Sequence, residues 1–219
     1  MNREVTIILG KTGYGKSWWS KLYIQKFSRR FVYDPAMSAE YQVLYENGAE
    51  IVADMTEQGE HFLNPENSFS RGIIDHNEVD MIGCLAFYFA NNIMLIEEVS
   101  NVFQKGLREL PQWAKRIIFY GRHKAVSIAL IAQRASSIPI DFRSQATRII
   151  SFQQHEYDDV SWLERFFGKE HCRSMPTLQK FTCLDYDNGQ IGQYSIIDRV
   201  QSTFGVKLDI GNDAMVECP

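Results

Sequence analysis

The feature that most constrains this chain is a run near its start that reads Gly-Lys-Thr-Gly-Tyr-Gly-Lys-Ser, residues 10–17. It follows a β-branched run at 4–9, which predicts a short buried strand. Apolar residues at helical spacing then extend from Lys16 to Phe27. In such a strand–loop–helix unit, glycines let backbone N–H groups turn inward, and the helix presents its N-terminus to the same point. The run therefore predicts a loop that cradles phosphate groups.

The residue types of this loop match the P-loop pattern G-x-x-x-x-G-K-[ST] and assign roles to two side chains. Lys16 is expected to reach the β- and γ-phosphates, and the hydroxyl of Ser17 to ligate Mg²⁺. The predicted nucleotide-binding residues are Gly10, Lys11, Thr12, Gly13, Tyr14, Gly15, Lys16 and Ser17. An accidental glycine-rich turn is the alternative, and the strand and helix on either side argue against it. We expect a nucleoside triphosphate and Mg²⁺ as cofactors.

Two carboxylates follow a second apolar strand, expected at 93–96. A P-loop NTPase needs a carboxylate on a neighbouring strand for the magnesium shell, and often a second one for the attacking water. We assign Glu97 to Mg²⁺ and Glu98 to orienting or deprotonating the water. The usual first acid is Asp, so this division stays open, and both could instead begin a solvated helix. Asp34 and Asp75 end other predicted strands and are alternative acids or turn residues.

A third predicted strand, at 126–132, ends on an amide. If that strand lies beside the P-loop strand, Gln133 would reach the γ-phosphate or the attacking water. Arg122 precedes the strand, and we expect it to complete the site of a neighbouring subunit as an arginine finger. A surface arginine is the alternative reading. His123 is expected to be a structural hydrogen-bonding residue.

The remaining pattern alternates strands and helices. Further strands are expected at 31–34, 49–53, 71–75 and 147–152, and further helices at 78–90, 101–110, 113–120 and 157–167. Two runs, 179–186 and 190–197, flank Asp-Asn-Gly, which is a strong hairpin signal. The fold class is therefore α/β, with a mostly parallel central sheet flanked by helices and a C-terminal β-hairpin. We expect a P-loop ATPase core at 1–178, with the hairpin and tail at 179–219 packed on the same domain.

Composition narrows the class of protein. With 219 residues and a net charge of -4, the chain is not a globally basic nucleic-acid binder, although a local basic channel remains open. Its four cysteines form no C-x-x-C pair, which indicates free thiols rather than zinc ligands or disulfides. The longest apolar stretches, 81–89 and 128–132, are too short to cross a bilayer. We expect a soluble intracellular protein with no stable membrane insertion of its own.

Several of these segments together resemble the HerA/FtsK superfamily of DNA-pumping ATPases. The resemblance rests on residues 10–17, on 93–98 and above all on 121–134, which runs from Gly-Arg-His to the Gln-Arg after the third strand. The segments 135–139 and 143–146 are also similar to the stretch that follows the sensor strand in that superfamily. The likeness covers about residues 4–153.

The resemblance implies a RecA-like sheet, a ring of subunits and ATP sites between them. It makes Lys16 and Ser17 part of Walker A, Glu97 and Glu98 Walker B, and Gln133 the polar sensor. The preference for ATP over GTP also rests on it alone. Arg122 matches the position favoured for the finger supplied in trans; its rivals are Arg116, Arg134 and Arg143.

The compact chain resembles one branch of the superfamily, the genome-packaging ATPases of tailless, membrane-containing icosahedral viruses. This implies an ATP-hydrolysing translocase that packages double-stranded DNA into a preformed capsid. Its implied partners are double-stranded DNA, further copies in a pentameric or hexameric homo-oligomeric ring, and a capsid vertex or portal protein. Its place would be the cytoplasm of an infected cell or a packaging vertex. Alternatives are a filamentous-phage assembly ATPase of the zonula-occludens-toxin type, and a nucleotide-dependent switch or small-molecule kinase.

Translocation requires the protein to contact the phosphates of the DNA backbone, mainly through Lys and Arg side chains. The segment 105–124 is rich in Lys and Arg, with Glu109 as its single acid. Candidates for lining the pore are Lys105, Arg108, Lys115 and Arg116. The alternative is an ordinary solvated helix face. Elsewhere, one of Trp18 and Trp19 is expected to pack on the sheet and the other to lie exposed at the nucleotide or subunit edge.

Overall fold

In a computed structural model of the chain, the residues described are 3–34, 69–72, 76–103, 112–205 and 207–208. The strand expected at 49–53 lies outside these residues, as does most of the helix expected at 101–110. Three residues singled out from the sequence, Asp75, Lys105 and Arg108, also lie outside them.

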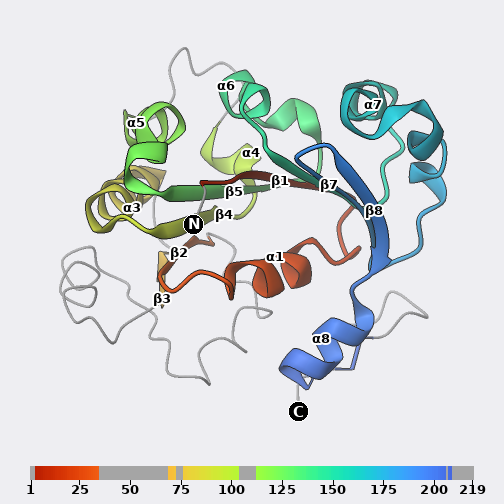
Figure 1. The fold of residues 1–219 in the computed structure, drawn as a ribbon, viewed down its shortest axis with the longest axis horizontal. Helices are drawn as coiled ribbons and strands as arrows, with labels where there is room; N and C mark the ends of the chain where they lie inside the picture. The colour runs from red at the N-terminus through yellow and green to blue at the C-terminus, as the bar shows by residue number, and fades with distance from the viewer. Residues whose placement is uncertain (1–2, 35–68, 73–75, 104–111, 206, 209–219) are drawn as a thin grey trace.

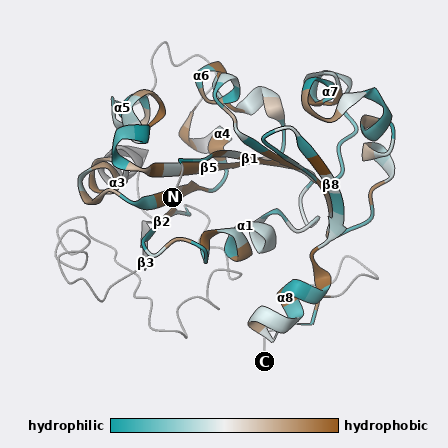
Figure 2. Cartoon of the chain, viewed as in Figure 1, coloured by the Kyte–Doolittle hydropathy of each residue, from teal (hydrophilic) through white to brown (hydrophobic). Residues whose placement is uncertain are grey.

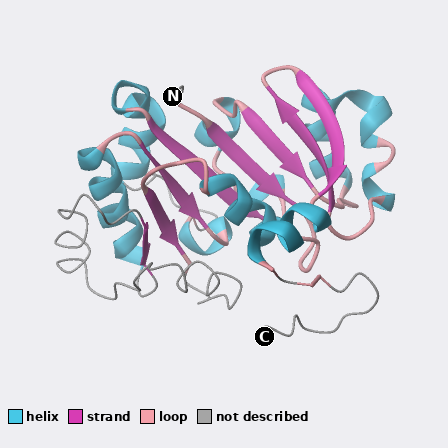
Figure 3. Ribbon diagram, turned by 60° about the horizontal axis from the view of Figure 1, so that its bottom comes forward, coloured by secondary structure: helices cyan, strands magenta, loops and turns pink. Residues whose placement is uncertain are grey.

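One sheet of eight strands, in the order β3-β2-β4-β5-β1-β6-β7-β8, organises the molecule (Figure 1). The strands are β1 (Val5–Leu9), β2 (Arg30–Tyr33), β3 (Phe69–Gly72), β4 (Asn92–Ile96), β5 (Val126–Ala132), β6 (Arg148–Ser151), β7 (Thr182–Asp187) and β8 (Gln190–Ser195). The first six pair in parallel, and the hairpin β7–β8 extends the sheet antiparallel from β6 (Figure 3). The mostly parallel α/β fold with a C-terminal hairpin is therefore confirmed.

Helices cover both faces of this sheet. They are α1 (Lys16–Ile24), α3 (His76–Phe89), α4 (Val99–Val102), α5 (Gln112–Tyr120), α6 (Ile140–Ser144), α7 (Tyr157–Cys172) and α8 (Ile197–Phe204). Short 3-10 turns are η2 (Gly121–Lys124), η3 (Ala135–Ser137) and η4 (Met175–Thr177). Among the described residues, none of the helices has the length and apolar character needed to span a bilayer.

Two predicted helices end differently in the structure, and one helix was not predicted. The first helix ends at Ile24, short of the expected Phe27. The helix α7 breaks where expected, at Gly168 with φ 73°, but helical backbone resumes beyond it as far as Cys172. The helix α8 was not predicted, because the apolar residues Ile196 and Ile197 prolonged the expected last strand.

The strands alternate between two hydrophobic cores, one on each face of the sheet. In β1, Ile7 packs in the core beneath α3 to α7, whereas Ile8 packs in the core beneath α1 and α8. In β5, Leu130 and Ile131 divide in the same way. Side chains alternate across a pleated strand, so a strand buried on both faces is apolar throughout. This is why the central strands are mostly hydrophobic (Figure 2).

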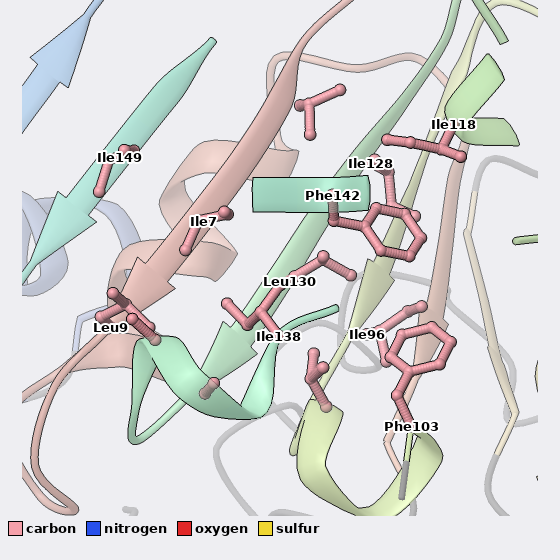
Figure 4. Packing of buried hydrophobic residues seen from close by; sticks show 14 of the residues in the cluster. Ile7, Leu9, Ile96, Phe103, Ile118, Ile128, Leu130, Ile138, Phe142 and Ile149 are labelled. Carbon is pink, nitrogen blue, oxygen red and sulfur yellow. The ribbon is translucent and has the colours of Figure 1, made fainter. Parts of the chain in front are cut away.

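The larger core fixes the connections that lead to the carboxyl ends of the strands. Figure 4 shows Leu130 on β5 among Ile96, Ile138, Phe103 and Phe142, which come from four other segments. The rings of Phe103 and Phe142 lie 5.5 Å apart, so α4 and α6 pack together over the sheet. Each such buried side chain contributes roughly 1.5–3 kcal/mol. The loops that follow β4 and β5 therefore begin from rigid supports.

Candidate nucleotide-binding site

The phosphate loop, residues 10–15, connects the buried strand β1 to α1. Gly10 has φ 149°, and a Cβ atom there would lie 2.6 Å from Cβ of Phe152, closer than real Cβ contacts come. Gly15 has φ 106° and caps the start of α1 in the left-handed region. A side chain at either position would be strained, so the sharp turn from strand to helix requires these two glycines.

Backbone hydrogen bonds hold the loop from two sides. The N–H of Lys11 donates to the carbonyl of Gln153, at 3.2 Å, and the carbonyl of Tyr14 accepts from the N–H of Phe181, at 3.0 Å. Within the loop, the ammonium of Lys16 donates to the carbonyl of Lys11, at 3.1 Å, and the side chain is buried. The predicted phosphate-binding cation therefore lies at the loop itself.

The two predicted Walker B carboxylates occupy different positions at the end of β4. Glu97 is buried, and its N–H donates to the carbonyl of Tyr33 at 2.9 Å, so it still belongs to the sheet. Glu98 is half-buried and has φ 46°, ψ 59°, directly before α4. A non-glycine residue in the left-handed region costs about 1–3 kcal/mol and persists where its surroundings hold it there. The alternative that both merely begin a solvated helix does not suit Glu97, which is buried.

The sheet order corrects one expectation about these acids. Strand β5 lies between β1 and β4, so the acidic strand is not adjacent to the P-loop strand. With strands 4.7–4.9 Å apart, β4 lies about 10 Å from β1. Leu9 pairs with Ala132, so the residues that follow, Gly10 and Gln133, are level with each other. The condition set for Gln133, that its strand lies beside the P-loop strand, is met by this register.

A buried amide that the sequence reasoning missed orients this part of the chain. The side chain of Gln154, after β6, donates to the carbonyl of Gln133 at 3.0 Å, and it is 4% exposed. Its neighbour Gln153 accepts from Lys11 and donates to the carbonyls of Pro176 and Leu178. The sequence signal was a pair of glutamines at the end of an apolar strand, the same signal that singled out Gln133.

Asp34 also ends its strand at this edge of the sheet. It follows β2 and is fully buried, and because Tyr33 pairs with Ile96, Asp34 and Glu97 are next to each other in register. We call the ends of β2, β4, β5, β1 and β6, with the residues that follow them, the carboxyl edge. The structure thus keeps Asp34 as an alternative acid at this edge.

The donor set at the carboxyl edge fits Mg²⁺. This ion prefers oxygen ligands and uses one or two protein groups, with water and phosphate oxygens completing its octahedron. The hydroxyl of Ser17 and the carboxylate of Glu97 are ligands of this kind. Within the described ranges, no group of three or more His, Cys, Asp or Glu side chains could hold a metal ion. A magnesium ion here would therefore depend on phosphate and water oxygens as well.

Arg122 lies at the opposite end of β5, in η2, and is exposed. Its Nε donates to Nε2 of His123 at 3.4 Å. The strand has seven residues, so at about 3.3 Å each Arg122 lies about 20 Å from Gln133 along β5. It therefore does not join the phosphate loop of its own chain.

Two of the three rival arginines, Arg134 and Arg116, have partners within the chain. Nε of Arg134 donates to Asp159 at 3.0 Å, and this hydrogen bond raises the pKa of the guanidinium. Arg116 stacks on Trp113, with 4.6 Å from its guanidinium carbon to the ring centroid. Arg143 is half-buried on α6. Of these arginines, Arg134 is the one most firmly held inside its own subunit.

The basic helix α5 is described only from residue 112 onward. Ala114, Ile117 and Ile118 face the core, whereas Arg116 is exposed and Lys115 is half-buried. The expected pore-lining role of these two cations is a prediction that the geometry leaves open.

The two tryptophans after the loop are both buried, so the expectation that one is exposed is wrong. Trp18 packs against Phe204 of α8, with ring centroids 5.8 Å apart. Nε1 of Trp19 donates to the hydroxyl of Tyr194 on β8, at 3.2 Å. The C-terminal elements, one of them unpredicted, cover both indoles.

No protein-family model and no curated protein matches the sequence. Solved structures do match. The genome packaging NTPase B204 from Sulfolobus turreted icosahedral virus 2 shares 16% identity, with a TM-score of 0.70 over 89% of this chain and 97% of that one. B204 from Sulfolobus Turreted Icosahedral Virus shares 19%, with a TM-score of 0.67 over 89% and 98%. VirB4 of Thermoanaerobacter pseudethanolicus shares 10%, with a TM-score of 0.64 over 87% and 88%. The chain thus has the RecA-like P-loop ATPase fold, in agreement with the family that its motifs resemble.

Proposed function

We propose that this protein is an ATPase whose site lies at the carboxyl edge. The observation that carries the proposal is the convergence there of the glycine-turned phosphate loop, Gln133 level with Gly10, and the buried Glu97. The fold adds support, because B204, which shares it, was solved with ATP-gammaS and with AMPPCP.

In this proposal each residue has a separate task. Lys16 and the N–H groups of the loop hold the β- and γ-phosphates, and Ser17 and Glu97 hold Mg²⁺, which neutralises charge developing on the phosphate oxygens. Glu98 orients or deprotonates the attacking water. Gln133 contacts the γ-phosphate or that water, and its backbone is fixed by the hydrogen bond from Gln154.

We further propose that hydrolysis drives double-stranded DNA into a preformed capsid, within a homo-oligomeric ring. Arg122 supports the ring, because it lies exposed at the opposite end of β5 and would reach a phosphate only in a neighbouring copy. A head-to-tail contact of this kind closes into a ring when its rotation closes. The solved neighbours of this fold include a genome packaging NTPase and a DNA-packaging ATPase. The partners would be duplex DNA and a capsid vertex or portal protein, in the cytoplasm of an infected cell.

The test is the rate of ATP hydrolysis by the wild-type protein with and without duplex DNA, together with its sedimentation. The expected result is hydrolysis by a ring-sized oligomer that duplex DNA accelerates. Turnover that ignores DNA but rises with a small phosphate acceptor would replace the packaging role with a kinase role. Absence of both hydrolysis and nucleotide binding would overturn the ATPase proposal itself.

A further inference from the structure

The turn before the C-terminal hairpin lies against the phosphate loop, although the two are far apart in the sequence. The N–H of Phe181 donates to the carbonyl of Tyr14 at 3.0 Å, and the carbonyl of Phe181 accepts from the N–H of Ile196 at 2.9 Å. The backbone of this one residue therefore joins the loop to the end of β8. In Figure 1 the hairpin lies to the right of α1, and its second strand, β8, leads into α8.

Phe181 adopts an unusual conformation to make these contacts. Its φ is +61°, in the left-handed region that a bulky side chain rarely occupies. Strain of this kind persists only where the surroundings determine it, and it gathers at sites that need a fixed geometry. Here the surroundings are the loop on one side and β8 on the other.

The side chain of Phe181 contacts the loop as well. It is buried, and a Cβ atom placed on Gly15 would lie 2.8 Å from its Cδ1 and 3.1 Å from Cδ1 of Ile196. These two side chains therefore lie close to Gly15, at the start of α1, and leave no room there for a side chain.

A second connection joins the hairpin to α1 one turn after the phosphate-binding lysine. Trp19 donates to the hydroxyl of Tyr194, which donates to Asp185 at 2.6 Å. Asp185 also accepts two hydrogen bonds from Arg148, at 3.0 and 2.6 Å. The hairpin thus holds both the loop and the helix that follows it.

We propose that Phe181 is a positioning residue for the phosphate loop. The hairpin, through Phe181, holds Tyr14 and Gly15 where the loop N–H groups can receive phosphates, so nucleotide binding and the order of the hairpin are linked. This inference rests on the proposed binding of ATP at the loop. A hairpin that merely completed the core would need neither the left-handed backbone nor a hydrogen bond to the loop.

The linkage has two measurable sides. Loosening the contact at Phe181 weakens nucleotide binding, because the loop must then be ordered at the moment of binding. Conversely, a bound nucleotide stabilises the hairpin to the same extent, since coupling free energies are reciprocal.

Two variants and a matched control test the first side. Phe181→Leu reduces the ring contact, and Phe181→Gly keeps the left-handed backbone while it removes the ring. Phe167→Leu is the control, because Phe167 is also buried but packs in the core on the other face. The expected result is a rise of about tenfold in the Kd for ATP-gammaS with Mg²⁺ in both Phe181 variants, with little change in the control. A wild-type Kd in the Phe181 variants, with a lowered Tm, would reduce Phe181 to an ordinary core residue and overturn the inference.

Hydrogen exchange on the wild-type protein tests the second side, and it needs no variant to fold. ATP-gammaS with Mg²⁺ should slow exchange at the amides of β7 and β8, whereas unchanged exchange would contradict the linkage. Wild-type protein that fails to bind ATP-gammaS would overturn the proposed function and this inference together. Wild-type protein that binds, with Phe181 variants that bind equally well, would overturn this inference alone.

Discussion

At the carboxyl edge of the parallel strands the chain buries the carboxylates of Asp34 and Glu97, whereas at the other end of β5 it exposes Arg122 and Lys124. We call the start of β5, with η2, the amino edge. The carboxyl edge contains the turned glycines and the buried amide of Gln154, which are features of a site held in one geometry. The amino edge offers solvent-exposed cations instead.

This difference indicates how the two edges can work together. A strand of seven residues separates them, so one copy of the chain cannot bring Arg122 to its own phosphate loop. In the proposed ring, a second copy stacked head to tail would bring its Arg122 to that loop. The comparison therefore yields predictions in which damage at one edge is distinguishable from damage at the other.

The largest effect is expected at the amino edge. Arg122→Ala should lower kcat by roughly 10³- to 10⁵-fold, the range that an arginine finger supplies in phosphoryl transfer. Steady-state ATP hydrolysis measures it, and Arg173→Ala, which changes an exposed arginine after α7, is the matched control.

Mixing two inactive variants tests whether Arg122 acts on a neighbouring subunit or on its own. Protein with Arg122→Ala retains an intact loop, and protein with Lys16→Ala retains an intact Arg122, so mixed rings should regain part of the lost activity. Mixtures that stay as inactive as their components, although sedimentation shows mixed oligomers, would count against the trans role.

The next effect is expected at the carboxyl edge. Glu98→Gln should lower kcat by about 10²- to 10⁴-fold, the range for losing a general base, and should leave the Kd for ATP nearly unchanged. Single-turnover hydrolysis and nucleotide titration measure the two quantities. If Asp34→Asn instead produces this pattern and Glu98→Gln does not, the roles of the acids must be exchanged.

A smaller effect is expected where the carboxyl edge is braced. Gln154→Leu leaves the carbonyl of Gln133 without its hydrogen bond, which should lower kcat by about tenfold and the free energy of unfolding by about 1–3 kcal/mol. Gln193→Leu, on the exposed strand β8, is the control. A loss of stability with unchanged kcat would show that Gln154 supports the fold without positioning Gln133.

The last prediction concerns a residue away from both edges and affects stability rather than turnover. Burial, with a contribution from Glu164, raises the pKa of the Cys172 thiol to about 11. A thiol with a raised pKa stays protonated in the folded chain while the unfolded chain ionises, so its stabilisation is complete below about pH 9 and declines as the pH rises towards 11. The decline should approach about 2 kcal/mol. Urea unfolding of the wild type and of Cys172→Ala at several pH values checks this prediction. If the free energy of unfolding declined equally with pH in both proteins, the prediction would be contradicted.

The elements that the sequence predicted well are those whose pattern is set by local burial. The strands β1 and β5 are apolar on both faces because helices cover both, so their bounds could be read almost residue by residue. The hairpin was predicted because Asp-Asn-Gly, residues 187–189, suits a tight turn, and Gly189 has φ 94°.

The features that were missed depend on contacts between distant segments. Strand order decides that β5 separates β1 from β4, and the sequence does not contain it. The burial of both Trp18 and Trp19 depends on α8 and β8, which pack on α1 from the far end of the chain. Phe181 and Gln154 gain their roles only when β6 and the hairpin lie beside the phosphate loop.

The measurement that tests the central claim most directly is ATP hydrolysis by Lys16→Ala protein beside the wild type, at equal fraction folded. If the carboxyl edge is an ATPase site, removing this ammonium from the loop should lower the rate by about 10²-fold or more, because it stabilises charge on the transferred phosphoryl group. The far-ultraviolet circular dichroism should stay the same. A Lys16→Ala protein that hydrolyses ATP at the wild-type rate would show that the phosphate loop is not where the reaction takes place.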